Sequence, residues 1–518
     1  DLQAAIDSFK QALKIKPDDA EVYNNMGNAL QANGCSKDAI NSFKQALKIK
    51  PDYAEAYINM GHVLTNKGDS ESAIKSYGIA LKFKPDNQSA YISRLHQQLH
   101  VCDWAALDQD RDIIAQLGTS TEPTQPLALI PLEDAPARHR IRSENATKVL
   151  HGHKTPMPLS ARPSKKRQHL RIGYFSTDFN EHPVAYLMAK VLEIHDRSSF
   201  EVYGYSIGPA KDDDMRRRLK KAFDIFIDVP DISDKDVALL ARQDKIDIAV
   251  DLTGHTKNNR LGIFAYRAAP IQVNFLGYPG TIGGNFVDYI IADQVLIPNG
   301  YEEYYNECIL RIPNTYMPTD NTRKIAKRIM TRSEMGLPTL GFVFCCFNNN
   351  YKISPREFDI WMRVLLKVDG SVLWLRNSNA WSEENLRTQA DIRGVDSSRL
   401  VFAGRVPMDE HLARQKLADL FIDTFTFNAH TTASEALWAG LPVVTRIGEG
   451  FAARVGASLL TAVGIPELIT ETDLEYEELI IYLAKNPKSL AVIQKTLMNK
   501  RLSTPLFDTS LYTKHLED

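Results

Sequence analysis

The first hundred residues repeat a helical pattern of apolar and polar positions with a period of 34 residues. The segments AIDSFKQALKIKPD, AINSFKQALKIKPD and AIKSYGIALKFKPD recur at this spacing, and Pro17, Pro51 and Pro85 stand at their ends. Proline stops a helix because it lacks an N–H group and clashes with the preceding turn. A 34-residue unit of two helices is typical of tetratricopeptide repeats, which we expect over residues 1–100.

Stacked repeats of this kind form a superhelix whose concave groove often holds extended peptides. We therefore expect the repeats to bind protein or peptide partners. The alternative is a stub that only packs against the rest of the chain. Because the sequence starts inside a repeat, we also expect it to be a fragment with further repeats upstream of residue 1.

Residues 101–167 are interpreted as a transition that contains helix and linker. The stretch 93–117 has a helical pattern, whereas 118–140 is rich in Pro and Thr, which predicts a loop. A second linker, 153–170, carries the basic cluster KKR, for which we expect a solvated surface rather than a binding patch.

From about residue 168 the pattern changes to short apolar runs of strand length alternating with helical stretches, and it restarts after a polar stretch that ends near residue 335. Strand alternating with helix predicts parallel sheets covered by helices. The expected fold is therefore a repeat superhelix followed by two Rossmann-like domains, 168–320 and 335–518. Ligands bind at the carboxyl ends of such strands, so we expect the site in the cleft between the two domains.

The composition excludes several classes of protein. The formal net charge of −2 argues against nucleic-acid binding, which needs a basic surplus or face. The sequence contains no run of about 18 apolar residues, so no membrane-spanning helix is expected. The 5 cysteines are scattered, which predicts neither a disulfide framework nor a zinc site. A reducing compartment, the cytoplasm, is the simplest location.

Polar residues follow the first strand of the second Rossmann-like domain, in the sequence FNNNYKISP. Asn349 and Lys352 lie in this loop, and Ser354 before Pro355 is a good helix start. Lys352 can place a cation in the cleft. Turn formation is the alternative explanation for the asparagines.

Further along the chain, Arg405 follows a strand, and His411 and Arg414 lie three residues apart on a predicted helix. That spacing places the last two on one helix face. The alternative for Arg414 is a solvent-exposed polar face.

The sequence NAHTTASEALWAG lies between a strand and a helix. The first turn of a helix has free N–H groups and the positive end of the helix dipole, to which Thr431 and Thr432 add hydroxyls and His430 a ring N–H. These groups suit a phosphate, and Glu435, one turn later, is close enough for a ribose hydroxyl. The alternative is a threonine cap without a ligand. With Lys352 on a neighbouring strand end, the pattern favours a nucleotide-diphosphate pocket.

The first Rossmann-like domain ends its strands in STDFNEHP, GHT and GYPGT. His182 precedes a helix at the first of these ends; a lone histidine is more often structural, but this position faces the expected cleft. Glycines in the other two loops let the backbone approach a ligand closely.

Tetratricopeptide repeats joined to two Rossmann-like domains with DFNEHP, RAAPIQVNFLGYPGT, FNNNYKISP, LADLFIDTFTFNAHTT and RLSTPLFD resemble the protein O-GlcNAc transferases, a group that includes the plant SPINDLY-type enzymes. The resemblance covers nearly the whole chain in the same motif order. It implies a GT-B fold and a metal-independent, inverting transfer of GlcNAc from UDP-GlcNAc to Ser or Thr hydroxyls of proteins, with no cofactor.

The resemblance also implies roles for individual residues. Lys352 would bind the diphosphate and stabilise the leaving group, and His182 would lie near the sugar and the acceptor as a candidate base. Asn349 stands where animal enzymes carry Gln, Glu435 where they carry Asp, and Met408 where they carry a Lys that stacks on uracil. The expected donor-binding residues are Asn349, Arg405, His411, Arg414, His430, Thr431, Thr432, Glu435, Pro279, Gly280 and Thr281.

The sequence departs from the animal enzymes because only about 40 residues join YIIAD to GFVFCC, so the long domain inserted there is absent, as in bacterial members. FNNNYK shares Asn-Asn with SPINDLY-type enzymes, which use GDP-fucose, whereas His430 before the Thr pair favours UDP-GlcNAc. Transfer of another sugar (GDP-fucose donor or asparagine glucosylation) and a non-catalytic repeat scaffold are the remaining alternatives.

Overall fold

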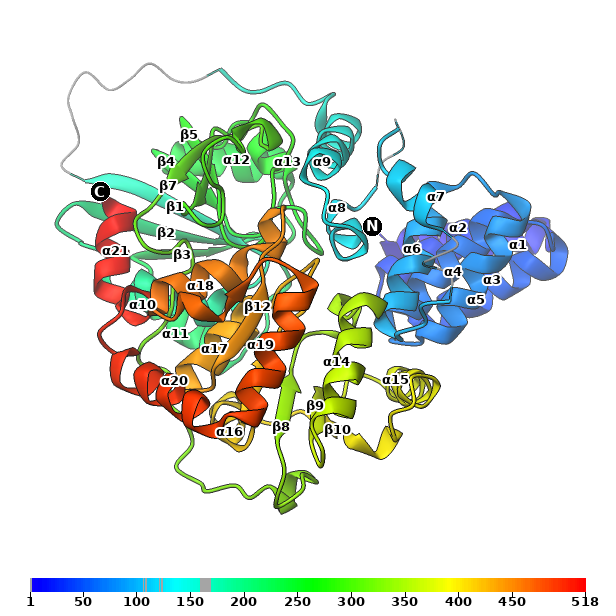
Figure 1. The fold of residues 1–518 in the computed structure, drawn as a ribbon. Coiled ribbons are helices and arrows are strands. Elements are labelled where there is room, and N and C mark those ends of the chain that lie inside the picture. Colours follow the sequence, from blue (N-terminus) through cyan, green and yellow to red (C-terminus); the bar gives the residue numbers. More distant parts are fainter. Residues whose placement is uncertain (1, 106, 108–109, 121, 123, 159–168) are drawn as a thin grey trace. The chain divides into compact units, whose positions relative to one another are not determined.

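The computed structural model describes residues 2–105, 107, 110–120, 122, 124–158 and 169–518 (Figure 1). The chain divides into two compact units, Asp1–Leu117 with Asn379–Asn385, and Gly118–Ser378 with Leu386–Asp518. The predicted basic cluster at 165–167 lies outside the described residues.

The first unit is built from antiparallel helix pairs. Each predicted proline follows a helix by two residues: Pro17, Pro51 and Pro85 come after α1, α3 and α5. Side-chain caps start several of the intervening helices; Asp19, for example, accepts hydrogen bonds from two backbone N–H groups of α2. The predicted repeat architecture is therefore confirmed, with helices α1 (Leu2–Ile15), α2 (Ala20–Ala32), α3 (Ser36–Ile49), α4 (Ala54–Asn66), α5 (Ser70–Phe83), α6 (Gln88–His100) and α7 (Arg111–Gln116).

Two equivalent glycines let the repeat helices approach each other. A Cβ atom added at Gly27 would lie 2.5 Å from the Phe43 ring, and one added at Gly61 would lie 2.6 Å from the Tyr77 ring. Both aromatic rings are buried. The small residue on one helix thus makes room for a large ring on the next.

We expect Gly61→Ala to lower the stability of the repeat by roughly 1–3 kcal/mol, because the added methyl group overpacks the Tyr77 contact. Gly78→Ala is the matched control, since Gly78 lies inside α5 with nothing near its Cβ position; there alanine should gain about 0.5–1 kcal/mol through helix propensity. Hydrogen exchange of the α4 and α5 amides in the whole chain measures both. Equal protection in the two variants would contradict this prediction.

The stretch 118–140, predicted as a loop, is partly helical. It contains α8 (Pro126–Leu129) and the start of α9 (Pro136–His151). Each helix has proline at its first position, where the missing N–H costs nothing and the fixed φ angle suits the helix. The prediction was wrong because these prolines begin helices rather than interrupt them.

The first sheet has seven parallel strands in the order β3-β2-β1-β4-β5-β6-β7. The strand order reverses between β1 and β4, which pair directly, Ile172 with Ile248. The loops that carry His182 and the GHT sequence follow these two strands. The elements are β1 (Leu170–Ser176), α10 (Pro183–Ile194), β2 (Phe200–Ser206), α11 (Asp214–Ala222), β3 (Ile225–Asp228), α12 (Asp234–Gln243), β4 (Ile248–Asp251), α13 (Gly262–Ala265), β5 (Ile271–Asn274), β6 (Tyr289–Ala292) and β7 (Cys308–Arg311).

The second sheet has six parallel strands in the order β10-β9-β8-β11-β12-β13, so its order reverses between β8 and β11. The predicted fold of two Rossmann-like domains is confirmed. The elements are β8 (Val343–Cys346), α14 (Pro355–Lys367), β9 (Val372–Arg376), α15 (Ala380–Ile392), β10 (Leu400–Ala403), α16 (Met408–Arg414), β11 (Leu420–Ile422), α17 (Thr431–Ala439), β12 (Val443–Arg446), α18 (Val455–Val463), β13 (Ile469–Thr470), α19 (Asp473–Lys485), α20 (Pro487–Lys500) and α21 (Thr509–Glu517).

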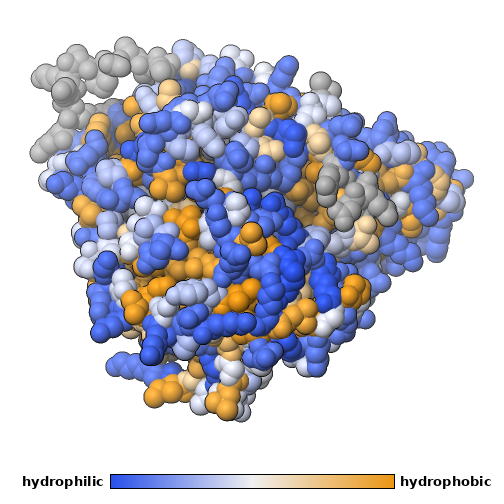
Figure 2. All heavy atoms as spheres, in the orientation of Figure 1, coloured by the Kyte–Doolittle hydropathy of each residue, from blue (hydrophilic) through white to orange (hydrophobic). Residues whose placement is uncertain are grey.

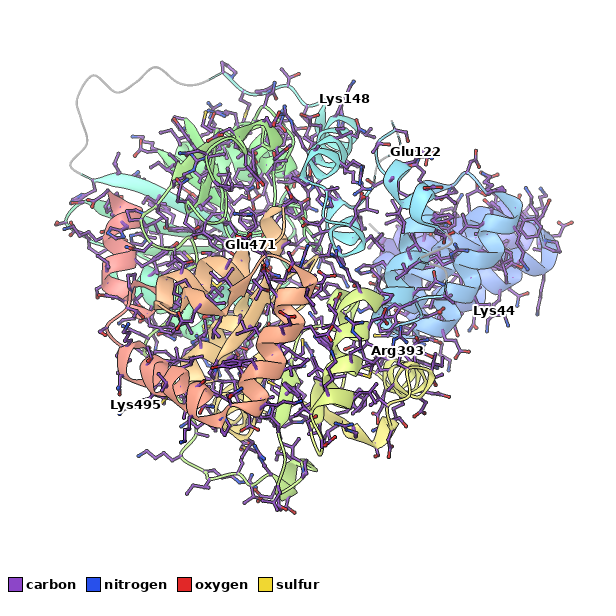
Figure 3. The ribbon with its side chains drawn as sticks, in the orientation of Figure 1. Lys44, Glu122, Lys148, Arg393, Glu471 and Lys495 are labelled. Atoms are coloured by element: carbon purple, nitrogen blue, oxygen red, sulfur yellow. The ribbon has the colours of Figure 1, made fainter. Side chains whose placement is uncertain are left out.

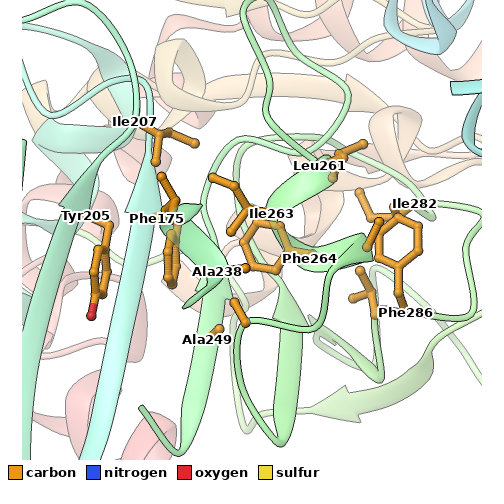
Figure 4. Close-up of a cluster of buried hydrophobic side chains, with 14 of the residues drawn as sticks. Phe175, Tyr205, Ile207, Ala238, Ala249, Leu261, Ile263, Phe264, Ile282 and Phe286 are labelled. Carbon is orange, nitrogen blue, oxygen red and sulfur yellow. The ribbon is translucent and has the colours of Figure 1, made fainter. Parts of the chain in front are cut away.

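The core of the first Rossmann-like domain combines aliphatic side chains with a group of packed aromatic rings (Figure 4). Phe175 stacks on Tyr205 with ring centroids 4.4 Å apart, and the Phe264 ring meets it edge-on at 5.4 Å. Phe427 and Ala452, which follow β11 and β12, belong to the same buried cluster. The two domains therefore share part of one hydrophobic core.

The last helix, α21, returns to the first domain and packs on α10 (Figure 1). His195 donates from Nδ1 to Glu517 Oε1 at 2.8 Å and accepts at Nε2 from the Tyr174 hydroxyl at 2.9 Å. The Tyr512 hydroxyl donates to Tyr316 O at 2.7 Å. These bonds connect the chain end to the first domain.

Hydrophilic residues predominate on the face shown in Figure 2, with hydrophobic residues scattered between them. The charged residues Lys44, Lys148 and Lys495, labelled in Figure 3, are exposed. In the part of the chain that the structure describes, no helix combines the length and the apolar character needed to span a bilayer.

Candidate active site

The loops after β8 and β11 meet at the point where the strand order of the second sheet reverses, which is where parallel sheets bind ligands. Lys352 comes from the first loop, and its Nζ donates to Asn428 O of the second loop at 2.9 Å. The same ammonium lies 3.8 Å from the centre of the Phe427 ring. The structure thus brings together the two motifs that the sequence singled out.

Lys352 has an unusual electrostatic environment. Burial lowers the pKa of its ammonium to about 7, against a smaller opposite effect of the Asp423 carboxylate. The ammonium contacts a carbonyl oxygen and a ring face, neither of which carries a full negative charge. A bound anion would therefore stabilise the charged form of Lys352 strongly.

Asp423, at the end of β11, holds the second loop in shape. Its Oδ1 accepts from the N–H groups of Thr424 at 2.8 Å and Ala429 at 2.6 Å, and its Oδ2 accepts from the Thr445 hydroxyl at 2.8 Å. Burial raises the pKa of this carboxyl to about 6. The carboxylate fixes the backbone that carries His430 and the start of α17.

The three residues His430, Thr431 and Thr432 start α17, but their polar groups differ in availability. His430 Nε2 donates to Ala452 O at 3.2 Å, and burial holds the pKa of its imidazole well below the usual range. The Thr432 hydroxyl donates to Asn348 Oδ1 at 2.5 Å. The ring N–H expected to hold a phosphate is therefore engaged, which leaves the Thr431 hydroxyl and the N–H groups of the first turn of α17 as donors.

On α16, Arg414 supports His411. Arg414 donates from Nε to His411 Nδ1 at 3.1 Å and from Nη1 to Gly404 O at 2.6 Å, and it is 5% exposed. The alternative of a solvent-exposed Arg414 is thus wrong. Because His411 Nδ1 accepts, the ring hydrogen lies on Nε2, which faces Glu435 Oε2 at 3.6 Å. Glu435 is 4% exposed.

Asn349 and Arg405 lie near an arginine that sequence reasoning missed. Arg376, at the end of β9, donates from Nη1 to Asn349 Oδ1 at 2.6 Å. Partial burial, and then the positive charge of Arg405, lower the pKa of Arg376. Its position at a strand end next to the FNNNYK loop is the signal that could have identified it.

In the first domain, His182 caps α10. Its Nδ1 accepts from Val184 N at 3.4 Å and lies 3.7 Å from Asp178 Oδ2. Burial lowers the pKa of the imidazole. One turn later, the pKa of Tyr186 is raised mainly by burial and then by the charges of Glu181, Asp213 and Glu435.

The GYPGT loop contributes to a crevice between the two domains. Pro279 and Gly280 line it opposite Thr426 and residues 450–452. Thr281 also lines this crevice, but it is 3% exposed and its hydroxyl donates to Glu307 Oε2 at 2.5 Å. The Thr281 hydroxyl therefore braces the loop, and the part of Thr281 in donor binding stays a prediction.

The model of glycosyl transferase family 41 matches residues 125–329 and 322–516, which include both sheets and all the groups described above. The chain belongs to glycosyl transferase family 41. Models of tetratricopeptide repeats match residues 1–34, 37–68 and 54–87 of this family-41 chain.

Named relatives support the same family. The family-41 chain is 37% identical over 371 residues to a probable UDP-N-acetylglucosamine–peptide N-acetylglucosaminyltransferase, SEC, of Arabidopsis thaliana, covering 70% of this chain and 38% of that protein. It is 30% identical over 478 residues to the UDP-N-acetylglucosamine–peptide N-acetylglucosaminyltransferase of Caenorhabditis elegans, covering 70% and 42%. The chain thus spans less than half of these relatives.

A solved structure matches over the whole length. A mutant of the O-GlcNAc transferase of Thermobaculum terrenum superimposes with a TM-score of 0.74 at 30% sequence identity, covering 100% of this chain and 93% of that one.

Proposed function

We propose that this chain transfers N-acetylglucosamine from UDP-GlcNAc to Ser or Thr hydroxyls of proteins, with inversion and without a metal. The observation that carries the proposal is the Lys352 ammonium, held by Asn428 O beside the N terminus of α17. The relatives from Arabidopsis thaliana and Caenorhabditis elegans are named as UDP-N-acetylglucosamine–peptide N-acetylglucosaminyltransferases, the first of them as a probable one.

The arrangement suits the departure of a nucleoside diphosphate. The acceptor oxygen attacks the anomeric carbon, the bond to the diphosphate breaks, and the leaving group gains negative charge. The Lys352 cation and the first-turn N–H groups of α17 are fixed in place before reaction, so they stabilise this charge more in the transition state than in the ground state. In this proposal, these fixed positive groups stabilise the leaving diphosphate in place of a metal ion.

The acceptor hydroxyl must also lose a proton, and His182 is the candidate base. Because its Nδ1 accepts from Val184 N, the ring hydrogen lies on Nε2, which then donates rather than accepts. To take a proton at Nε2, His182 would carry its own hydrogen on Nδ1, which Asp178 at 3.7 Å could stabilise. General-base catalysis by His182 stays a prediction.

A donor panel tests the function directly. The chain is incubated with an acceptor protein and UDP-GlcNAc, UDP-glucose or GDP-fucose, and the product is analysed by mass spectrometry. We expect HexNAc on Ser or Thr with UDP-GlcNAc. If fucose or hexose is transferred preferentially, or if the sugar is attached to asparagine, the proposed reaction is wrong and the chain is a transferase with another donor or acceptor. Loss of UDP binding in calorimetry would favour a non-catalytic scaffold.

We further propose that the repeats bind the acceptor proteins, because stacked tetratricopeptide units commonly bind extended peptides. A location in the cytoplasm and independence of cofactors stay predictions.

Donor affinity should depend on pH through Lys352. The pKa of this ammonium is about 7 in the free protein, lowered by burial, so it is charged below pH 7 and neutral above. Affinity for UDP-GlcNAc is therefore expected to be highest below pH 7 and to fall by up to about tenfold per pH unit above it. Calorimetry from pH 6 to 9 measures this, with the intact donor as ligand because the terminal phosphate of UDP titrates near pH 6.

Lys352→Met is the control for the pH dependence. This variant should bind weakly at every pH, without the decline above pH 7. An affinity in the parent protein that stays constant or rises from pH 7 to 9 would contradict the assignment.

A further inference from the structure

Arg323 is a buried cation whose hydrogen-bonding capacity is unused. It lies in the segment between β7 and β8 that joins the two sheets, and its side chain is 5% exposed. Within the described residues, none of its three guanidinium nitrogens has a hydrogen-bond partner. A buried guanidinium without partners is costly, so this one calls for a functional explanation.

The nearest carboxylate to Arg323 is Glu435. Arg323 Nη1 lies 3.9 Å from Glu435 Oε1, a distance that brings opposite charges together without a hydrogen bond. The other carboxylate oxygen, Oε2, lies 3.6 Å from His411 Nε2. Glu435 therefore stands between the Arg323 guanidinium and the His411 ring, in the pocket expected to hold the nucleoside.

Hydrogen bonds to two separate parts of the chain hold the backbone around Arg323 in place. Asp320, three residues before Arg323, accepts a hydrogen bond from Arg218 Nη1 of α11 at 2.6 Å. Thr319 donates from its hydroxyl to Leu506 O at 2.6 Å. Arg323 is thus presented to Glu435 by a segment that contacts both domains, rather than by a free surface loop.

A carboxylate is a strong acceptor for hydroxyl groups when it is ionised, and a hydrogen bond to a charged group is worth more than one between neutral groups. A cation close to a buried carboxylate attracts it and fixes its orientation. Arg323 supplies that cation, because its guanidinium stays protonated in proteins. Ribose hydroxyls would donate hydrogen bonds to the Glu435 carboxylate, and the unpaired N–H groups of Arg323 would donate to ribose oxygens.

Resting on the proposed function, we propose that Arg323 is a positioning residue for the nucleoside. Its guanidinium holds the Glu435 carboxylate oriented toward the ribose hydroxyls of a nucleoside diphosphate, and through it sets a preference for ribonucleotides over deoxyribonucleotides.

The test compares the Kd of UDP with the Kd values of 2′-deoxy-UDP and 3′-deoxy-UDP, measured by calorimetry on the whole chain. In the unmodified protein, loss of the hydroxyl that Glu435 accepts should weaken binding by about tenfold or more. In Arg323→Met this preference should shrink to about twofold or less, while affinity for the deoxy nucleotide changes little. Arg323→Lys, which keeps a cation beside Glu435, should restore part of the preference.

Arg454→Met is the matched control, because Arg454 also connects the two domains but has its hydrogen bonds satisfied, to Val295 O at 2.9 Å and Gly448 O at 2.7 Å. This variant should keep the parent preference between UDP and its deoxy analogues.

The proposal is overturned if Arg323→Met keeps the parent ratio of Kd values, or if it weakens UDP and both deoxy analogues equally. Failure of both Arg323 variants to fold would also overturn it, since the arginine would then be a structural residue. Binding of UDP by the unmodified protein without any preference for ribose overturns the proposal and leaves the proposed function standing. If the unmodified protein does not bind UDP, both this proposal and the proposed function are wrong.

Discussion

Lys352→Ala is expected to slow sugar transfer by roughly 10²–10³-fold, the usual cost of removing one fixed group that stabilises developing charge. The truncation removes the ammonium beside Asn428 O and Phe427. The effect should appear mainly in kcat/KM at saturating acceptor, because the ammonium contributes to both donor binding and leaving-group stabilisation.

Lys367→Ala is the matched control for this variant. Lys367 lies at the end of α14, 55% exposed, where its Nζ contacts Glu477 Oε1 at 2.8 Å. Glu477 is buried but also accepts two hydrogen bonds from Arg363, so it keeps a cationic partner when Lys367 is truncated, and Lys367 is not part of the proposed site. Both variants should therefore remain folded, and only Lys352→Ala should lose activity. A near-normal rate for Lys352→Ala would refute the role assigned to this lysine.

Asp423→Ala is expected to give the largest loss of stability, roughly 3–5 kcal/mol. The substitution leaves the N–H groups of Thr424 and Ala429 and the hydroxyl of Thr445 buried without their acceptor, and each orphaned donor costs about 1–3 kcal/mol. It also removes the carboxylate that partly offsets the burial of Lys352. The pKa of Lys352 should then fall further, and donor affinity at pH 7 should fall with it.

The urea midpoint of the second unit and the Kd of UDP-GlcNAc together test the Asp423 prediction. Asp369→Ala serves as the control, because Asp369 is an exposed aspartate of the same domain and surface substitutions usually change stability by no more than about 0.5 kcal/mol. Equal urea midpoints for the two variants would show that Asp423 does not organise the loop.

The internal strands of both sheets were predictable, but three edge strands were not. Strands β3, β7 and β13 each lie at the end of a sheet. β3 and β7 contain no fully buried residue, and β13 has only two residues. An internal strand is buried on both faces and reads as a continuous apolar run, whereas a short, half-exposed edge strand leaves no such pattern.

The candidate site was predictable in part for a related reason. Lys352 and His430 follow β8 and β11, and the ends of parallel strands meet at one edge of a sheet. Arg376 and Arg323 escaped notice. Arg323 stands in the polar stretch NTRKIAKR, where composition alone predicts a solvated cation, and its burial beside Glu435 depends on how the two domains close.

The sequence by itself determined the 34-residue repeats, the two series of alternating strands and helices, and the loops that carry the polar residues, because periodicity and residue type act locally along the chain. The tertiary structure alone decided which polar groups remain available to a ligand. Thr281 is bonded to Glu307, 26 residues away, and His430 to Ala452, so their donors are engaged by partners that no local pattern specifies. Burial of Lys352, which sets its pKa, likewise results from packing among segments distant in the sequence.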